Sequence, residues 1–580
     1  MAGWLGHQVW HSHSHNQRES MLFRAQLLAD ALELPLISNL QGNTDDYANP
    51  YYQRLKSNLL RLGKAFPDYR FIYLMARDEE GTIRFLIDDV PDDDTAYVSP
   101  GETFPEAPQF LHGLFDNQSS SGFVGPVSDR WGTWFTAYAK IPVAFVRDGF
   151  ESTVLLGLDI DASDWHRNLR RALAPTFFIT VFLILLNWIA FFLLRTQFGQ
   201  RAANSIIRHR LELLLILASG IPLSAYLGHS LWTYENKVTQ SRFADIAQSH
   251  AQLLISGLQT FSRVEMETLG RYLDLNPEFH PDALRAQGEL LLTNPSILAW
   301  TWSPVIPHRE RNRFELEHGS SEGPLELWSL DEMGRKIPIP EAEFYLPVSV
   351  YGIGSIDLPS MLGFGVHSTP LRRAAIAEAT ATRLPTATEP FPYSESFGGN
   401  SGVRVYRPVF ASDNPDNLRG VLAIGLAPSL LLEALPDTGA TELTLNFINL
   451  SGERIRLTAS PQSPTTKRSV EFEYALMLFG QVFLVSVIPT AEWIALNTST
   501  YSGWLTFVLG TLVTLSIGLV VHTLKKRSES LEVLVEQSTC ELKKSESRYR
   551  MLADNSPIGL YEYRYDNNDS QYPESVSFFH

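Results

Sequence analysis

Histidines near the start of the chain and a run of aspartates further on are the residues whose spacing could bind a metal. The histidines stand within nine residues of one another, at His7, His11, His13 and His15. Neutral imidazoles this close can share a metal ion. The alternative, which we favour, is a polar segment at a membrane interface, where Trp4 and Trp10 would also lie.

The acidic run Asp88–Asp94 could bind a hard cation, because its aspartates supply oxygen ligands. However, the run lacks the regular alternation and the closing glutamate of a calcium loop, and it contains Pro91. We therefore expect a solvated turn here. The sequence predicts neither a metal site nor a cofactor in this chain.

Catalytic arrangements were sought and none was found. There is no Gly-rich phosphate loop followed by Lys and Ser or Thr, and there is no Gly-x-Ser-x-Gly nucleophile elbow. Phosphoacceptor-histidine, nucleotide-binding and diguanylate cyclase signatures are also missing, and no pair of carboxylates stands out for acid–base work. We predict no catalytic residue and no enzyme activity for this chain.

Composition limits the classes of protein further. At 580 residues the chain is long enough for about three or four domains. Its 19% charged and 44% hydrophobic residues fit a globular protein with a few membrane spans. The net charge of −17 gives no electrostatic footprint for nucleic acid. The single cysteine, Cys540, excludes a disulfide scaffold and a zinc site of thiolates.

Three apolar stretches predict transmembrane helices, each close to the ~20 residues that a span requires, although the weaker second one has Glu212 at its edge. They are Pro175–Leu194, Leu211–Leu231 and Trp504–Val521. The basic cluster at residues 525–527 places the end of the third span in the cytoplasm, and the loop 195–210 holds arginines and no acid. Alternation then places 1–172 and 232–502 outside, although Arg167, Arg170 and Arg171 oppose this sidedness.

The first residues predict a juxtamembrane helix, 1–30. Met1–Gln17 lacks the basic and apolar regions of a signal peptide. An odd number of spans with an outer N-terminal domain leads us to expect a further span upstream of this chain.

Residues 31–172 predict an α+β domain. Asn49–Lys64 has helical periodicity. Strand-forming runs follow at Phe71–Met75, Ile83–Ile87, Trp134–Ala139 and Thr153–Leu158.

Four motifs of this domain occur in order: Asn49–Leu55, Tyr69–Met75, Gly125–Trp134 and Leu156–Asp161. This series resembles the PAS-like, Cache-type sensor domains found outside the membrane in bacterial histidine kinases and diguanylate cyclases. The resemblance implies a small-ligand pocket on an antiparallel sheet, lined by Tyr73, Asp129, Trp131 and Asp159. Aromatic walls with a carboxylate suit a small cation or amine. The alternative is that Trp131 and Tyr73 are core residues.

Residues 233–500 predict a second outer domain, which begins with a long amphipathic helix, Gln240–Leu273. The motifs after it are Ile297–Glu315, Phe344–Val348, Leu362–Gly365, Pro370–Ala375, Val405–Phe410 and Leu418–Leu422.

The order of these motifs resembles the CHASE domain, an extracytoplasmic sensor of receptor kinases and cyclases, from Lys237 to Leu435. A strand-rich extension follows to about Leu496. The resemblance implies a stalk helix with two PAS-like subdomains, and a pocket lined by Trp302, Tyr345, Phe364 and Tyr406. Aromatic core positions are the alternative. Two features depart from the family's ligand contacts. Gly365 stands where relatives usually have aspartate, and the segment Tyr351–Pro359 is less polar than in relatives.

Past the third span, a 3.5-residue repeat predicts a parallel coiled coil over 524–548 that continues to Leu552, and hence a homodimer. The repeat positions are Leu524, Ser528, Leu531, Val535, Ser538, Leu542, Ser545, Tyr549 and Leu552. Ser547–Tyr561 resembles the opening of a cytoplasmic PAS domain. The region 549–580 does not complete it, so we expect a truncated or frame-shifted end.

Together these features predict an α+β protein with two extracytoplasmic PAS-like sensor domains and three transmembrane helices. We expect a multi-pass receptor of the bacterial inner membrane, with its sensor domains in the periplasm. It would bind a small molecule and no nucleic acid. A histidine kinase or diguanylate cyclase output would lie beyond this chain. The alternative is a non-enzymatic membrane binding protein or scaffold.

Overall fold

The computed structural model divides the chain into two compact units, Met1–Thr176 with Glu235–Ser499, and Phe177–Tyr234 with Thr500–His580. Each unit is described by itself. The structure describes residues 2–116, 119–147, 150–197, 205–319, 323–331, 335–354, 360–392, 401–411, 414, 416–427, 430, 439–459, 471–497, 501–554, 561–562 and 577–578.

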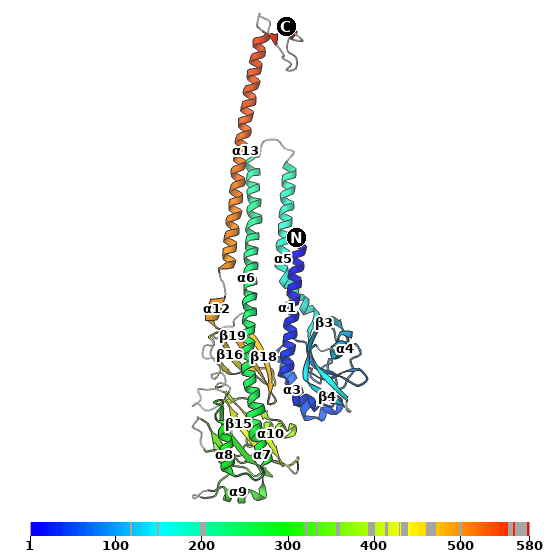
Figure 1. The fold of residues 1–580 in the computed structure, drawn as a ribbon, viewed down its shortest axis with the longest axis vertical. Helices are drawn as coiled ribbons and strands as arrows, with labels where there is room; N and C mark the ends of the chain where they lie inside the picture. The colour runs from blue at the N-terminus through cyan, green and yellow to red at the C-terminus, as the bar shows by residue number, and fades with distance from the viewer. Residues whose placement is uncertain are drawn as a thin grey trace, which may run out of the picture. The chain divides into compact units, whose positions relative to one another are not determined.

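The first domain of the first unit is built on a five-stranded antiparallel sheet in the order β2-β1-β5-β4-β3. Its strands are β1 Phe71–Arg77, β2 Ile83–Asp88, β3 Ser121–Ser128, β4 Thr133–Arg147 and β5 Phe150–Asp161. Its helices are α1 Ala2–Ala31, α2 Leu34–Ser38, η1 Thr44–Ala48, α3 Pro50–Ala65 and α4 Gln109–Asp116. The predicted helix 49–64 and the four predicted strands all form (Figure 1).

Helix α3 shows why its sequence folds this way. Asn49 accepts a hydrogen bond from Tyr51 N as the N-cap residue, and Pro50 occupies the first turn, where no N–H is needed. Leu55, Leu59 and Leu62 recur at helical spacing and are fully buried in the domain core.

The end of α1 also belongs to this core. Apolar residues at helical spacing are buried there and pack with the sheet: Met21, Ala25, Leu28, Ala29 and Leu32. The helix expected as a juxtamembrane segment is therefore part of the first domain from residue 21 onward.

A second region of the first unit holds a six-stranded sheet, with the path β11-β6-β15-β14-β12 and β13 paired to β14. The strands are β6 Ile297–Pro304, β11 Val350–Ile353, β12 Thr386–Ala387, β13 Phe391–Pro392, β14 Ser401–Phe410 and β15 Leu418–Leu426. The helices are α7 Met266–Leu275, α8 Pro281–Leu291, η3 His308–Glu310, α9 Arg311–Glu317 and α10 Pro370–Thr382. Two short pairs complete it, β7 Ile306–Pro307 with β10 Phe344–Tyr345, and β8 Trp328–Leu330 with β9 Lys336–Pro338.

A long helix, α6 Ser205–Thr260, precedes this region and continues through a π-helical turn, η2 Phe261–Glu265, into α7. The predicted stalk helix 240–273 therefore forms, interrupted by that turn. Its buried stripe has helical spacing and consists of Phe243, Ala247, Ala251, Leu254 and Leu258.

The strand-rich extension is a four-stranded antiparallel sheet in the order β17-β16-β19-β18, followed by α12 Ala491–Asn497. Its strands are β16 Thr441–Ile448, β17 Arg454–Ala459, β18 Phe472–Leu478 and β19 Gln481–Pro489. Alternate residues point to opposite faces of a strand. Ala475, Met477 and Val482 pack with the first domain, whereas Leu476 and Phe483 pack with the α6 stripe. This sheet thus forms the layer between the first domain and the long helix.

The second unit consists mainly of helical segments from α5 Ala162–Gln197, α6 and α13 Ser502–Asp554, with a short pair β20 Tyr561–Glu562 and β21 Ser577–Phe578. Among the described residues, two helical stretches are long and apolar enough to cross a membrane, 213–260 and 491–552. The second contains the predicted span 504–521, and the first contains residues 213–231 of the predicted span 211–231. In α5 the described apolar stretch is shorter, Phe177–Leu186, so the span 175–194 stays a prediction. Residues 555–560 of the predicted PAS opening 547–561 lie outside the described residues.

Candidate ligand-binding site

A narrow cavity of about 30 Å³ lies in the first domain, on the sheet face opposite to α1 and α3. Strand alternation creates this face, because Phe71, Tyr73 and Met75 of β1 point to one side while Ile72 and Leu74 point to the other. The lining residues are Phe71, Tyr73, Phe85, Asp88, Val90, Ala96, Val98, Phe104, Asp129, Trp131 and Asp159. The cavity thus contains all four site residues that were predicted for this domain.

Aromatic rings form one wall of this cavity. The ring of Phe85 lies at its centre, 5.5 Å from Tyr73, 5.3 Å from Phe104 and 5.7 Å from Trp131, measured between centroids. The contacts with Tyr73 and Trp131 are edge-to-face, the arrangement that ring quadrupoles favour. Sequence analysis missed Phe85 and Phe104, although Phe85 lies in a predicted strand.

Asp159, near the end of β5, is a deeply buried carboxylate of the cavity. Its Oδ1 accepts hydrogen bonds from Thr136 Oγ1 at 2.6 Å and from Tyr73 OH at 3.2 Å. Gly157 makes this geometry feasible, because a Cβ there would lie 2.3 Å from the Tyr73 ring. Burial raises the pKa of Asp159 to about 7, while the hydrogen bonds from Thr136 and Tyr73 act in the opposite direction.

Asp129 lies in the turn between β3 and β4 and fixes the position of Trp131. Its Oδ1 accepts hydrogen bonds from the backbone N–H groups of Trp131 and Gly132 at 2.8 and 3.0 Å, and from Trp134 Nε1 at 3.0 Å. These three bonds all end on one oxygen. The guanidinium of Arg130 lies 4.2 Å from the Trp131 ring centroid, so this indole already attracts a cation.

Asp88 is the third carboxylate of the cavity, and its charge is paired. Lys56 Nζ lies 2.5 Å from Asp88 Oδ1, and Val98 N donates to Oδ2 at 3.0 Å. Burial raises the pKa of Asp88, and Lys56 opposes this shift. Lys56 was missed because a lysine on an amphipathic helix is expected to face solvent. Asp129 and Asp159 therefore remain the carboxylates suited to a bound cation.

The four aromatic residues predicted for the second domain are buried, and they are distributed over separate core clusters. Trp302 packs in the core that includes the α6 stripe, and Tyr345 packs with Phe314. Phe364 and Tyr406 share a third cluster. The structure brings only this last pair together, in positions that agree with the core alternative. Residues 355–359 of the less polar segment lie outside the described residues.

The structure describes the side chains of only some of the residues that were considered as metal ligands. Asp92, Asp93 and Asp94 are exposed in the segment after β2, and Asp94 Oδ1 accepts a hydrogen bond from Ala96 N, as in a turn. Of the four histidines, only the His15 side chain is among those described, and it lies beside Glu19. Within the described residues, no group of three or more potential metal ligands gathers.

Residues 285–460 match the CHASE domain family. This match confirms the resemblance inferred from the order of motifs, and it extends from α8 into the four-stranded sheet. The chain therefore contains the sensory module of a ligand-sensing receptor. No significant match is found among curated proteins.

Solved structures of bacterial chemoreceptor sensor domains are similar to parts of this chain. The ligand-binding domain of a Pseudomonas aeruginosa amino acid chemoreceptor with GABA is 14% identical, with 43% of this chain and 100% of that chain covered and a TM-score of 0.25. The periplasmic sensory domain of a Campylobacter jejuni chemoreceptor is 10% identical, with 45% and 98% covered and a TM-score of 0.28. TM-scores this low do not identify a shared fold.

Proposed function

We propose that the first domain binds a small organic cation, such as a protonated amine, and that the chain is the sensory part of a bacterial inner-membrane receptor. The observation that carries this proposal is the cavity in which Trp131 and Phe85 stand beside Asp129 and Asp159. A ring face attracts a cation through its quadrupole, and a desolvated carboxylate adds a charge-assisted hydrogen bond.

The remaining parts of the proposal concern the membrane and the output. Both sensor domains would lie in the periplasm, with three spans from α5, α6 and α13. Ligand binding would shift a two-state equilibrium in the outer domains, and the change would pass to a dimeric helix in the cytoplasm. A histidine kinase or cyclase would receive it outside this chain. The CHASE match and the two apolar helical stretches support this arrangement.

Thermal stabilisation of the purified full chain in nanodiscs tests ligand binding. The probes are ethanolamine, putrescine, GABA and L-arginine; ethanolamine and putrescine are also compared with their uncharged derivatives, N-acetylethanolamine and N,N′-diacetylputrescine. A ligand that binds only the folded state raises the melting temperature by mass action. We expect at least one amine to raise it and its uncharged counterpart to have no effect.

Variants locate the site of any such effect. Asp129→Asn, Asp159→Asn and Trp131→Ala should each weaken binding by tenfold or more, or about 1.4 kcal/mol. Asp93→Asn is the matched control, because this aspartate is exposed on the same domain. Equal loss in the control, or full binding by the three cavity variants, would refute the proposed site. Stabilisation by uncharged ligands alone would exclude the cation preference.

A further inference from the structure

Helix α3 carries polar side chains on two opposite faces. A residue advances about 100° around an α-helix, so Lys56 lies about 200° from Arg54, whereas Asn58 and Arg61 share the Arg54 face. All four side chains are buried, which is unusual for charged residues on a helix.

One face of α3 is attached to the segment that closes the cavity. Lys56 Nζ contacts Asp88 Oδ1 at 2.5 Å and donates to Val90 O at 2.6 Å. It also lies 4.5 Å from the Tyr97 ring centroid. Val90, Ala96 and Val98 line the cavity, so a ligand that displaces this segment acts directly on α3.

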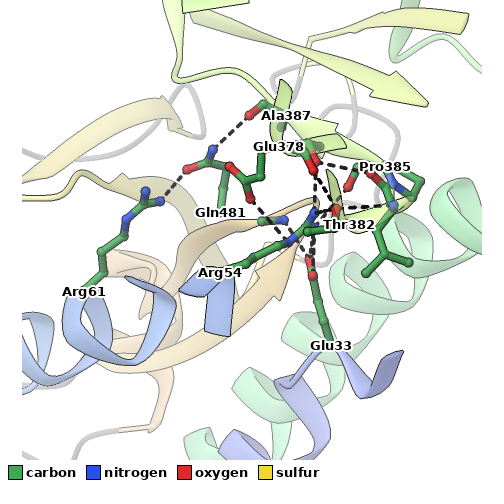
Figure 2. A network of polar contacts seen from close by, with 11 residues as sticks. Glu33, Arg54, Arg61, Glu378, Thr382, Pro385, Ala387 and Gln481 are labelled. Carbon is green, nitrogen blue, oxygen red and sulfur yellow. Dashed lines mark hydrogen bonds and ion pairs between the residues drawn. The ribbon is translucent and has the colours of Figure 1, made fainter. Parts of the chain in front are cut away.

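The other face of α3 is attached to the CHASE region. The Arg54 side chain is only 2% exposed, and its Nη2 lies 2.8 Å from Glu33 Oε2. Figure 2 shows the same guanidinium directed at α10 and β12, where Nη1 donates to Thr386 Oγ1 at 2.9 Å and Nη2 donates to Pro385 O at 3.0 Å. Glu378 of α10 lies 3.6 Å from Arg54 Nε.

The turn between β18 and β19 completes this contact. Gly480 N donates to Glu33 Oε1 at 2.8 Å, and Gly480 has a φ of +73°. A Cβ at Gly480 would lie 2.8 Å from Glu378 and 2.9 Å from Arg54, so the turn approaches the ion pair as closely as backbone can. Arg61 donates to Gln481 Oε1, and Gln481 Nε2 in turn donates to Ala387 O at 2.8 Å (Figure 2).

This contact is specific, but it is not optimised for stability. Asn58 is fully buried between the two arginines, and neither of its amide atoms has a hydrogen-bond partner among the described residues. An unsatisfied buried amide and a buried ion pair both cost desolvation free energy. Water can reach these polar groups if α3 moves, and this would recover part of the desolvation free energy. A second arrangement with α3 displaced therefore costs less free energy here than it would at an apolar interface.

We propose that α3 couples the two sensor domains, so that occupation of the cavity changes how firmly Arg54 and Arg61 hold the CHASE region. This inference rests on the proposed function, because it takes the cavity to be the ligand site. The helix acts as a positioning element: Lys56 contacts the cavity side, and Arg54 contacts α10, β12 and the β18–β19 turn. Small shear movements of packed helices are a common form of such coupling.

Hydrogen exchange of the full chain in nanodiscs tests the coupling, with putrescine, GABA, ethanolamine or L-arginine as the probe. In the unmodified chain, a bound amine should change exchange about tenfold in the peptides 384–388 and 478–483. Arg54→Ala and the milder Thr386→Val should raise exchange there without a probe. Both variants should also abolish the change in exchange that the amine causes. Because coupling is reciprocal, they should alter the affinity for the amine as well. Gln53→Ala, exposed on the same helix, should behave as the unmodified chain.

The outcomes separate this inference from the proposed function. Amine binding without an exchange change in 384–388 and 478–483 overturns the coupling and leaves the binding site standing. If no amine binds, the coupling is tested by comparing the melting-temperature shift of the double variant with the sum of the shifts of Lys56→Met and Arg54→Ala. Coupled residues give non-additive shifts. Additive shifts would overturn it. Should Lys56→Met not fold, K56M/D88N removes both charges together and serves in its place.

Discussion

At the scale of single residues, Asp129 and Asp159 are the two cavity carboxylates proposed to bind the cation, and their surroundings stabilise the charged form to different degrees. Asp129 is stabilised by three hydrogen bonds in a turn, whereas Asp159 is buried beneath Tyr73. Burial favours the neutral form of Asp159, and its pKa is raised to about 7. In the ligand-free domain, its contribution to stability is present below the pKa of the unfolded chain. This contribution is lost as the pH rises towards 7.

Amine binding should therefore depend on pH. A bound cation requires the ionised form of Asp159, whose pKa is about 7, so its affinity should rise by about thirtyfold between pH 5.5 and pH 8 as a proton is displaced. The amine stays charged over this range. Titration calorimetry in buffers of different ionisation enthalpy would measure both the affinity and the proton release.

Asp159→Asn is the control for this pH dependence. Its binding should be weaker at pH 8 and nearly independent of pH. Other titratable groups also face the cavity or its back wall, namely Asp88 with Lys56, Asp89, Tyr73 and Tyr138. A pH dependence that persists in Asp159→Asn would assign the effect to Asp89, whose pKa burial also raises to about 7.

At the scale of elements, helical periodicity and runs of strand-forming residues predicted α3 and four strands of the first domain correctly. Leu55, Leu59 and Leu62 identified α3, and the run Phe71–Met75 identified β1, whereas the place of Tyr73 in the cavity was implied by the family resemblance. Periodicity could not place Lys56 or Arg54, because each is buried by partners from distant segments. Asp88 and Thr386 are separated from them by 32 and 332 residues. For the four aromatic residues of the second domain, the sequence left a pocket and a core position as alternatives, and their burial in core clusters agrees with the second.

The two apolar helices of the second unit make close contact at small residues. A Cβ at Gly228 of α6 would lie 2.5 Å from Gly503 O of α13, and one at Gly220 would lie 2.3 Å from Thr514. Small residues allow helix backbones to approach in lipid, where packing drives association.

Gly228→Ala should therefore lower the melting temperature of the full chain in nanodiscs, by the equivalent of about 1–3 kcal/mol for overpacking. Gly257→Ala is the matched control on the same helix, because nothing lies within 4 Å of its Cβ position. That substitution should be neutral or stabilise by up to about 1 kcal/mol, since alanine is the better helix former. Equal effects of the two substitutions would show that the helices do not pack at Gly228.

At the scale of the whole molecule, one sheet of the first unit joins the first domain to the core around α6. Residues of β18 and β19 alternate between the core of the first domain and the core around α6. The polar contact of α3 lies at the edge of this sheet, at the β18–β19 turn (Figure 2). Movement of the first domain can thus reach α6 through a packed layer, and α6 is one of the two helices apolar enough to enter a membrane.

The last prediction concerns the C-terminal part of helix α13. Along α13, the predicted seam leaves apolar side chains such as Leu531, Val535 and Leu542 more than half exposed in the single chain. In a parallel coiled coil, position 531 would face its counterpart in the second copy, and position 540 would point away from it. A disulfide needs Cα atoms within about 7 Å. L531C in a C540S background should therefore cross-link under mild oxidation in membranes, whereas the native Cys540 should not. Cross-linking at 540 alone would contradict this seam, and a monomer by mass photometry would contradict the homodimer itself.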